Sequence, residues 1–492
     1  MTRYWPALLA YSLLLLLPLA LSHTLAQWLG WDARPLLDDI ATGLAMTGFA
    51  AVMVEFVLLG RFKPLSWTLG SDWLMQAHQL FARTAAVMLL LHPFLYSLWG
   101  ARGQHWDPNF ASSLRATGDN WGIITGFIAW VALGFLVGMA ILRHTQLYER
   151  WRQWHVVMAL AVLVLGMHHT WAVGRYSQIT PVWILWCVLA SVALLSVVWV
   201  YAVRPQLQRG QPYTVASVRS VAERIWELVL QPNTSQAMRF QAGQFAWLRM
   251  HGQAPHHDHP FSISSAPLPG GQVHMLIKEA GDFTQGLDRL AGHTAYLDGP
   301  YGHFTLPADN RPLVLLAGGI GVAPFVALLQ ACAQQGSQRP IRLVYADRHA
   351  GQMVDVAAMA GTRTLGDYAC LGVVEQTNGG SHDHPLGEAC TEAPVHIGRL
   401  DATGLSVVLA HPQIAPLVAD AHFMLCGPNG MMDQAETALM AAGVPEQRIH
   451  AEHFQYDFKG QSPLARKARR YWLTTSMGLV AGIVLVVLAA RL

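Results

Sequence analysis

The sequence predicts a membrane α-helical bundle, of six helices plus one C-terminal helix, fused to a β-barrel domain and a doubly wound α/β domain. The first part of the chain, up to residue 205, consists mainly of apolar runs of about 20 residues, the length that crosses a bilayer. The part that follows shows short β-rich runs and then alternating strands and helices. Charged residues make up 13% of the chain, against about 25% in ordinary soluble domains. This deficit indicates a membrane protein with a soluble module attached.

Overall composition excludes some classes of partner. The formal net charge of +2 counts against a nucleic-acid partner. The five cysteines form no CxxC pair and no even framework. We therefore expect reduced cytosolic thiols rather than disulfides or a structural zinc site.

The apolar runs predict where the chain crosses the membrane. They lie at roughly 6–29, 36–60, 73–99, 121–142, 154–173, 181–203 and 473–490. We expect the first to be a retained helix rather than a signal peptide, because it is long and lacks a small-x-small cleavage site. Arginine and lysine gather after the second, fourth and sixth spans and before the last, which places these loops and the soluble module in the cytoplasm.

Histidines recur in the third and fifth spans at matched depths. His78 and His92 are fourteen residues apart, and His155 precedes the pair His168 and His169 by thirteen and fourteen. Fourteen residues place two levels roughly 20 Å apart along a helix and on nearly the same face. One histidine in a bilayer often only bonds a neighbouring helix, but four at two depths predict two haems, each held by one histidine from each span. The inner pair would be His78 with His155 and the outer pair His92 with His168 or His169, where ideal periodicity favours His169.

The soluble module contains two kinds of pattern. Short β-rich runs between Tyr213 and Leu306, separated by turns, predict a small antiparallel barrel. From Arg311 onward the alternation of strand, turn and helix predicts a doubly wound parallel sheet. The turn "GGIGVAPF" (318–325) joins a buried strand to a helix, so its glycines let the backbone approach a diphosphate. A second turn, "CGP" (426–428), follows a later strand.

The stretch "HHDHPFSISSAP" (256–267) can be read as a metal site or as the start of a cofactor-binding strand. A second "HDHP" at 382–385 has no strand or glycine turn attached, so we expect it to be a surface loop with weak metal affinity. We therefore expect His256, His257 and Asp258 to form the exposed end of a loop, and the strand to begin at His259.

Five motifs in one order carry a family resemblance. "HPFSISSAP", "KEAGDFT" (278–284), "DGPYG" (298–302), "AGGIGVAPF" and "LCGP", behind six membrane spans, resemble the NADPH oxidase and ferric reductase superfamily over about residues 35–458. The resemblance implies a ferric-reductase-like transmembrane haem domain (1–205), an FAD-binding β-barrel of the ferredoxin–NADP reductase type (210–307) and an NAD(P)-binding α/β domain (308–458). Residues 459–492 are then expected to form a basic linker and a C-terminal transmembrane helix.

The resemblance also implies roles for individual residues. For FAD it implies contacts from the "HPFS" and "KEAGDFT" motifs: His259 at the diphosphate, Phe261 on the cofactor, Ser262 near the flavin N5, Gly281 and Thr284 at the diphosphate turn, with Pro260 and Lys278 beside them. For the nicotinamide dinucleotide it implies Gly318, Gly319, Gly321 and Pro324, with Cys426, Gly427 and Pro428 at the second turn and Arg348 as a candidate partner of a 2′-phosphate. The catalytic candidates are Cys426 at the nicotinamide, Ser262 at the flavin, and Tyr456, or else Phe458, as the ring that covers the flavin. The family spacing of thirteen selects His168 over His169.

The function that the resemblance implies is electron transfer from cytoplasmic NADPH or NADH through FAD and two b-type haems to an outer acceptor, either oxygen, giving superoxide, or a ferric chelate. Delivery of electrons to a periplasmic partner protein is the alternative, and a haem-free transporter with a regulatory nucleotide domain is a remote one. We expect a multi-pass protein of the bacterial inner membrane. Two departures stand out: the additional C-terminal helix, which could tether the nucleotide domain or bind a partner, and Tyr96, which stands where animal oxidases carry a second outer histidine and so counts against dedicated superoxide production.

Overall fold

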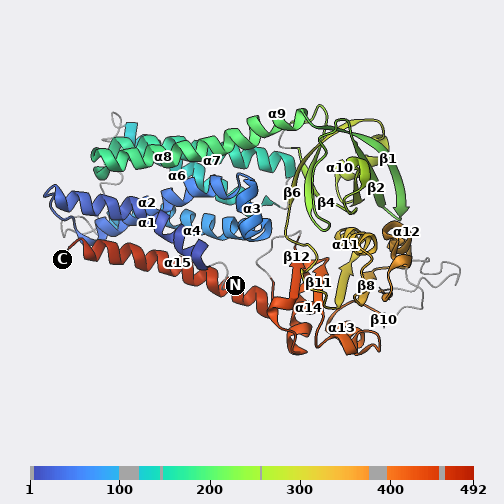
Figure 1. Ribbon diagram of the computed structural model, residues 1–492. Helices are drawn as coiled ribbons and strands as arrows, with labels where there is room; N and C mark the ends of the chain where they lie inside the picture. Colours follow the sequence, from blue (N-terminus) through green and yellow to red (C-terminus); the bar gives the residue numbers. More distant parts are fainter. Residues whose placement is uncertain are drawn as a thin grey trace. The chain divides into compact units, whose positions relative to one another are not determined.

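The computed structural model describes residues 5–98, 121–143, 148–254, 257–375, 396–453 and 460–491. The chain forms two compact units (Figure 1). The membrane unit comprises Met1–Leu65, Trp73–Val203 and Ala468–Leu492, and the two-sheet unit comprises Ser66–Asp72 and Arg204–Lys467.

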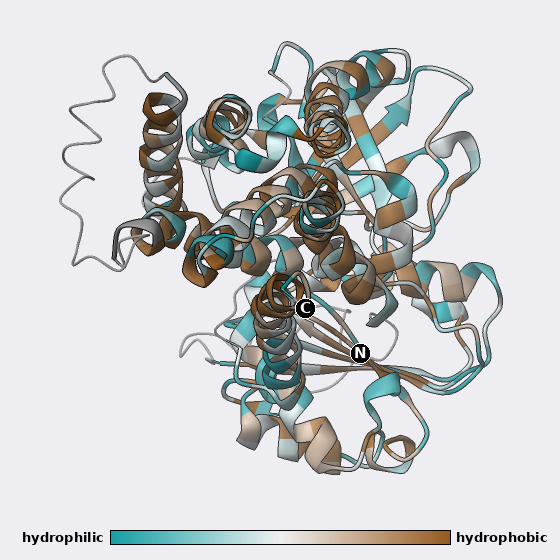
Figure 2. Ribbon diagram, turned by 90° about the vertical axis from the view of Figure 1, so that its left-hand side faces the viewer, coloured by the Kyte–Doolittle hydropathy of each residue, from teal (hydrophilic) through white to brown (hydrophobic). Residues whose placement is uncertain are grey.

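Seven helices among the described residues are long and apolar enough to cross a membrane, which confirms the predicted bundle (Figure 2). They are α1 (Trp5–Trp28), α2 (Leu36–Leu58), α4 (Ser71–Leu98), α6 (Trp121–Ile141), α7 (Tyr148–Val173), α8 (Thr180–Val198) and α15 (Pro463–Ala489). A short helix, α3 (Lys63–Leu69), lies between α2 and α4, and a π-helical turn at Trp199–Val203 leads from α8 into α9 (Arg204–Arg209).

The last helix differs from the prediction at its start. The basic run "RKARR" was expected to be a linker, but α15 already begins at Pro463 and contains it. Arginine, lysine and alanine are strong helix formers, and proline is well suited to the first helical turn. The basic segment is therefore the first part of the helix itself.

The C-terminal helix packs against α1 and α2 within the membrane unit. A Cβ added to Gly43 of α2 would lie 2.4 Å from Cγ2 of Ile483, and one added to Gly482 would lie 2.7 Å from Cδ1 of Leu16. Glycine at these places leaves room for a side chain of the neighbouring helix, and small residues of this kind are common at helix contacts in membrane bundles. This seam makes α15 an integral seventh helix of the bundle.

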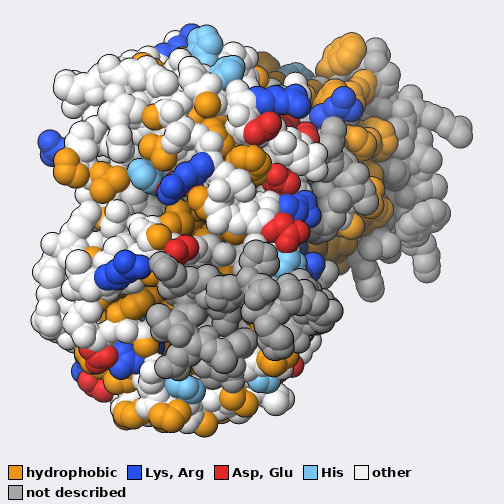
Figure 3. Space-filling view, turned by 90° about the vertical axis from the view of Figure 1, so that its right-hand side faces the viewer, with side chains coloured by type: hydrophobic (Ala, Val, Ile, Leu, Met, Phe, Trp, Pro, Cys, Tyr) orange, Lys and Arg blue, Asp and Glu red, His pale blue; other side chains and the backbone are white. Residues whose placement is uncertain are grey.

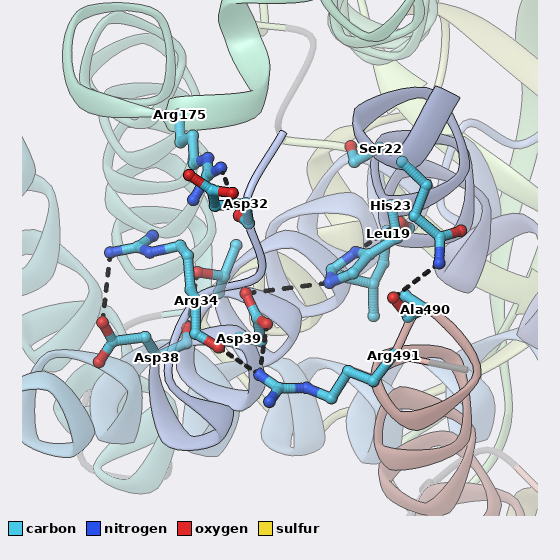
Figure 4. Close-up of polar contacts among 12 residues, drawn as sticks. Leu19, Ser22, His23, Asp32, Arg34, Asp38, Asp39, Arg175, Ala490 and Arg491 are labelled. Carbon is cyan, nitrogen blue, oxygen red and sulfur yellow. Dashed lines mark hydrogen bonds and ion pairs between the residues drawn. The ribbon is translucent and has the colours of Figure 1, made fainter. Parts of the chain in front are cut away.

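Polar contacts fix the far end of the same helix (Figure 4). Arg491 donates to Oδ2 of Asp39 at 2.7 Å and to the carbonyl of Arg34 at 2.5 Å. Gln27 of α1 donates to the carbonyl of Ala490 at 2.7 Å. Asp39 is buried, so the guanidinium supplies the opposite charge that a buried carboxylate requires.

The first sheet of the two-sheet unit is the predicted antiparallel barrel. Its strands are β1 (Pro212–Ala222), β2 (Ile225–Pro232), β3 (Phe245–Met250), β4 (His259–Ser262), β5 (Val273–Lys278) and β6 (Thr294–Tyr301), in the order β4-β3-β6-β1-β2-β5. Just beyond β4, a bridge between Ile263 and Met275 brings the two edge strands together. The short helix α10 (Asp282–Gln285) follows β5.

The second sheet is parallel, as predicted, with strands in the order β10-β9-β8-β7-β11-β12. The strands are β7 (Leu313–Gly318), β8 (Ile341–Asp347), β9 (Tyr368–Val374), β10 (His396–Ile397), β11 (His422–Cys426) and β12 (Ile449–Glu452). Helices α11 (Ala323–Gln334) and α12 (Val356–Ala360) pack on one face, and α13 (Ala402–Ala410) and α14 (Asn429–Ala441) on the other. The strand order reverses between β7 and β11, and ligands of such sheets bind at the carboxyl ends of the strands at this switch point.

Two further expectations concern cysteines and the surface. Cys187, Cys332 and Cys426 are free thiols, but Cys370 in β9 is disulfide-bonded to a partner outside the described residues. The expectation of reduced thiols is therefore wrong at Cys370, and no short cysteine spacing signalled it. On the face seen in Figure 3, basic, acidic and hydrophobic side chains are interspersed.

Candidate functional site

The structure brings together the two histidines predicted to form the inner pair. The rings of His78 on α4 and His155 on α7 have centroids 6.3 Å apart. Two metal–imidazole bonds of about 2 Å each, with the distance from nitrogen to ring centre added on both sides, give a similar spacing. In addition, Nδ1 of His155 is buried without a hydrogen-bond partner. The spacing of the rings fits a metal-centred group between them, whereas Nδ1 of His155 lacks a holding hydrogen bond.

Hydrogen bonds determine which ring nitrogen of each histidine is free. His78 donates from Nδ1 to Oε2 of Glu55 at 2.8 Å, and His92 donates from Nδ1 to the carbonyl of Leu89 at 2.6 Å. Since Nδ1 carries the proton in these bonds, Nε2 keeps its lone pair. Metal-binding histidines in proteins are commonly held in this way by a carboxylate or a backbone carbonyl.

For the outer pair, both His168 and His169 have the same chemistry on Nδ1. His169 donates to the carbonyl of Gly122 at 2.9 Å, and Nδ1 of His168 lies 2.9 Å from the hydroxyl of Thr125. That hydroxyl can donate to the carbonyl of Trp121, so it can accept from His168. Each histidine therefore presents a free Nε2.

The environment of His92 favours one of the two. The imidazole that interacts electrostatically with His92 is that of His169. A Cβ on Gly126 of α6 would lie 2.2 Å from Nδ1 of His169, so glycine at this position makes room for the ring. The electrostatic contact with His92 and ideal periodicity point to His169, whereas the family spacing points to His168.

Aromatic rings line the barrel at the predicted flavin motif. His259 in β4 stacks on Phe283 with centroids 4.3 Å apart and planes 18° apart, and Phe261 lies nearly parallel to the same ring at 6.1 Å. Ser262 is the last residue of β4 and is buried. Pro260, between His259 and Phe261, is exposed. The structure therefore brings the "HPFS" and "KEAGDFT" motifs together into one apolar face that suits a flat cofactor.

The turn after β5 is shaped by Thr284. Its hydroxyl accepts from the backbone N–H of Ala280 at 2.8 Å and of Gly281 at 2.9 Å. These N–H groups are therefore engaged within the turn, so Thr284 has a structural part in the turn that was predicted to bind the diphosphate. Lys278 donates to Oε1 of Gln352 at 3.2 Å and lies 4.0 Å from Oδ1 of Asp347, next to the parallel sheet.

The "HHDHP" segment corrects one expectation. Asp258 is buried, not exposed, and it interacts electrostatically with Arg249 of β3. His256, the second "HDHP" (382–385), Tyr456 and Phe458 lie outside the described residues. Within the described ranges, no group of three or more His, Cys, Asp or Glu side chains is arranged to hold a metal ion.

The two predicted glycine turns meet at the switch point of the parallel sheet. A Cβ on Gly321 would lie 2.2 Å from the carbonyl oxygen of Cys426, and one on Gly427 would lie 3.0 Å from Cα of Gly318. Gly319 has φ of +55°, which favours glycine. Pro324 stands in the first turn of α11 and Pro428 precedes α14, so two helices begin at this crevice. Cys426 itself is fully buried.

A residue that the sequence reasoning missed lies beside this crevice. Asp347 ends β8 with a side chain 4% exposed, and its Oδ2 is buried without a hydrogen-bond partner. This oxygen would lie 3.7 Å from a Cβ on Gly319, and burial raises the pKa of the Asp347 carboxyl. The neighbouring Arg348 is exposed. An acidic residue at the end of the second strand is the signal that could have found it, because such residues bind ribose hydroxyls in dinucleotide folds.

Comparisons with known protein families match the chain in three consecutive segments. Residues 44–166 match the ferric reductase like transmembrane component, residues 210–305 an FAD-binding domain and residues 315–377 an oxidoreductase NAD-binding domain. The chain therefore carries the architecture of ferric reductases and NADPH oxidases. It is a multi-pass membrane protein with a reductase module of the ferredoxin–NADP reductase type.

Three individual relatives each match half of the chain or less. The chain is 29% identical over 250 residues to the reductase component of propane 2-monooxygenase from Mycolicibacterium goodii, a match that covers 49% of this chain and 66% of that protein. It is 31% identical over 209 residues to a flavohemoprotein from Bordetella pertussis, covering 39% and 47%. The FAD/NAD-binding domain of a nitric oxide dioxygenase from Vibrio cholerae O1 biovar El Tor matches with a TM-score of 0.39 and 22% identity, covering 50% of this chain and 98% of that one. The chain thus spans two thirds or less of the curated relatives.

Proposed function

We propose that the protein transfers electrons across the membrane, from NADH or NADPH on the cytoplasmic side to an acceptor on the outer side, by means of FAD and two bis-histidine haems. The observation that carries the proposal is the pairing of His78 with His155 at a spacing that fits one metal between the rings. This pair occurs in the same chain as a flavin-binding and a nucleotide-binding domain.

The chain's own residues would hold the groups at defined places. His78 and His155 would hold the inner haem, and His92 with His169, or His168, the outer one. The aromatic face formed by His259, Phe261 and Phe283, with Ser262 at the end of β4, would hold the flavin. When bound, FAD supplies hydride acceptance and one-electron release, and haem iron supplies one-electron relay.

The nucleotide would bind at the carboxyl ends of β7 and β11. Gly319 and Gly321 would let the backbone approach its diphosphate, and Cys426 would lie under its nicotinamide. The buried Asp347 supports NADH as the donor, because a carboxylate accepts hydrogen bonds from a ribose 2′-hydroxyl and repels a 2′-phosphate. The exposed Arg348 is the residue that would serve NADPH instead.

The acceptor would be a small oxidant on the outer side. A ferric chelate is favoured over oxygen, because the sequence has Tyr96 where a second outer histidine would serve superoxide production. A periplasmic partner protein is the alternative acceptor. The basic loops support a cytoplasmic position for the two-sheet unit. The membrane would be the inner membrane of a bacterium.

A spectroscopic experiment tests the proposal. The purified full-length chain, supplied with haem and FAD, should show a bis-histidine haem spectrum that NADH reduces. His78→Ala should remove one haem and stop electron transfer. His168→Ala and His169→Ala form a matched pair, and the variant that loses the outer haem identifies the ligand. Absence of haem from the wild-type protein, or haem that neither NADH nor NADPH reduces, would rule the proposal out.

A further inference from the structure

A carboxylate lies inside the membrane unit next to the proposed inner-haem ligand. Glu55 on α2 is 6% exposed and stands in an apolar span. An acidic residue within a bilayer is costly, and it is usually retained for a function and held by a specific partner. The hydrogen-bond partners of its two carboxylate oxygens therefore indicate the role of Glu55.

Both oxygens of Glu55 accept hydrogen bonds from other helices. His78 of α4 donates from Nδ1 to Oε2 at 2.8 Å, and the hydroxyl of Tyr11 on α1 donates to Oε1 at 2.8 Å. Tyr11 is buried as well. The carboxylate is thus fixed in place by one donor on each side, and the imidazole of His78 cannot rotate without breaking a charge-assisted bond.

Aromatic packing extends this arrangement to the C-terminal helix. The ring of Tyr11 stacks on Phe81 with centroids 4.2 Å apart and planes 23° apart. Phe81 in turn meets Trp472 of α15 edge to face, with centroids 5.2 Å apart. The additional helix therefore packs, through Phe81, against the side chain that holds Glu55. Nearby, the hydroxyls of Thr84 on α4 and Ser476 on α15 form a hydrogen bond of 3.0 Å.

The four predicted haem ligands differ in what their Nδ1 atoms contact. Only His78 among them meets a carboxylate. His92 and His169, the alternative to His168, meet backbone carbonyls, and Nδ1 of His168 meets the hydroxyl of Thr125. All of these partners are neutral, and Nδ1 of His155 has no partner among the described residues. A negative acceptor makes the imidazole a stronger electron donor at Nε2, which stabilises the more positive, oxidised state of a bound metal.

We propose that Glu55, held by Tyr11, is a positioning residue that fixes His78 with Nε2 toward the inner haem iron and lowers the reduction potential of that haem relative to the outer one. This inference rests on the proposed function. An inner haem of lower potential makes electron flow toward the outer side favourable. Through Trp472 and Phe81, the C-terminal helix would then help to hold Tyr11, and with it Glu55, in place.

A redox titration of the full-length, haem-loaded protein tests the inference. Glu55→Gln keeps the size of the side chain but removes its charge. Both haems should be retained, and the reduction equilibrium of the inner haem should shift toward the reduced state by about tenfold, which corresponds to 59 mV for a one-electron couple. The inner haem is identified as the one that a His92→Ala chain retains. The outer haem should not move.

A matched control separates the specific effect from a general loss of buried charge. Asp39→Asn removes another buried carboxylate of the same helix, one that contacts Arg491 rather than a haem ligand. It should leave both potentials unchanged. An unchanged or lowered inner-haem potential in Glu55→Gln, or an equal shift in the control, would overturn the inference.

A second variant covers the case in which Glu55→Gln does not fold. Tyr11→Phe keeps the carboxylate of Glu55 but removes the hydroxyl that donates to its other oxygen. The hydrogen bond from His78 then meets a more negative acceptor, so the reduction potential of the inner haem should decrease. No change or an increase would count against the inference. The two proposals fail differently: a wild-type protein without haem contradicts the proposed function, whereas two haems with unshifted potentials in both variants contradict only the role of Glu55.

Discussion

At the residue scale, two buried carboxylates matter most. Glu55 and Asp347 both place a carboxylate where burial is unfavourable, one in a membrane span and one beside a glycine turn. Retaining such a group costs free energy unless a donor or a ligand satisfies it. Glu55 has two donors within the protein, whereas Oδ2 of Asp347 has none among the described residues.

The unsatisfied oxygen of Asp347 leads to a prediction about the electron donor. Asp347→Ala should raise the KM for NADH about tenfold or more with a smaller effect on kcat, because a hydrogen bond to a charged group contributes about 1.5–3 kcal/mol. Steady-state reduction of a ferric chelate with NADH and with NADPH measures this. Arg348→Ala is the adjacent control and should leave the KM for NADH unchanged. If instead NADPH is the better donor and Arg348→Ala abolishes that preference, the assignment to NADH is wrong.

At this scale the sequence predicted the two glycine turns, but it did not signal which polar residues beside them would be buried. The glycines of the two turns were found because strand–turn–helix patterns are local, and the structure brings them together at one crevice. Asp347 was passed over in favour of its neighbour Arg348, because exposure depends on tertiary packing. Asp258 was expected to be exposed for the same reason, although its interaction with Arg249 arises between segments of the barrel.

At the element scale, hydropathy alone placed all seven spans, since a bilayer requires about 20 apolar residues whatever the tertiary packing. It could not show that the basic run before the last span is helical, because charge obscures the hydropathy signal while leaving helix propensity high. Nor could it show that the last helix packs against α1 and α2. That contact depends on glycines whose importance appears only when two helices approach.

The glycine seam between α2 and α15 can be tested by adding single methyl groups. Gly43→Ala would place its Cβ 2.4 Å from Ile483 and should destabilise the membrane unit by about 1–3 kcal/mol, the usual cost of overpacking. Gly138→Ala on α6 is the matched control, because nothing lies within 4 Å of its added Cβ. The measurement is the temperature at which each detergent-purified protein loses its monodisperse peak in size-exclusion chromatography. Equal midpoints for the two variants would show that α15 is not closely packed there.

At the scale of the whole molecule, the distribution of basic residues predicts the side of the membrane on which the nucleotide acts. Arginine and lysine gather after the second, fourth and sixth spans, and the two-sheet unit follows the sixth, so the proposed orientation puts them on one side. Because a dinucleotide does not cross a bilayer, the enzyme should respond only to the nucleotide on the face that carries this unit.

Sealed vesicles of known orientation test this direction. NADH added to inside-out vesicles should reduce the haems and a membrane-impermeant ferric chelate enclosed in the lumen. Right-side-out vesicles should respond only after detergent opens them. Reduction by external NADH in intact right-side-out vesicles would mean that the positive residues do not set the orientation.

The place of α15 in the membrane unit also has a consequence for the order of biosynthesis. Between the end of α8 and the start of α15 the ribosome must synthesise almost the whole of Arg204–Lys467, which takes on the order of tens of seconds at about 5–20 residues per second. During that interval Asp39 has no guanidinium from Arg491, and the glycine face of α2 has no helix against it. A nascent chain therefore carries an incomplete bundle in the bilayer until its reductase module has been made, and a product that stalls within that module would leave a buried carboxylate uncompensated for membrane quality control to detect.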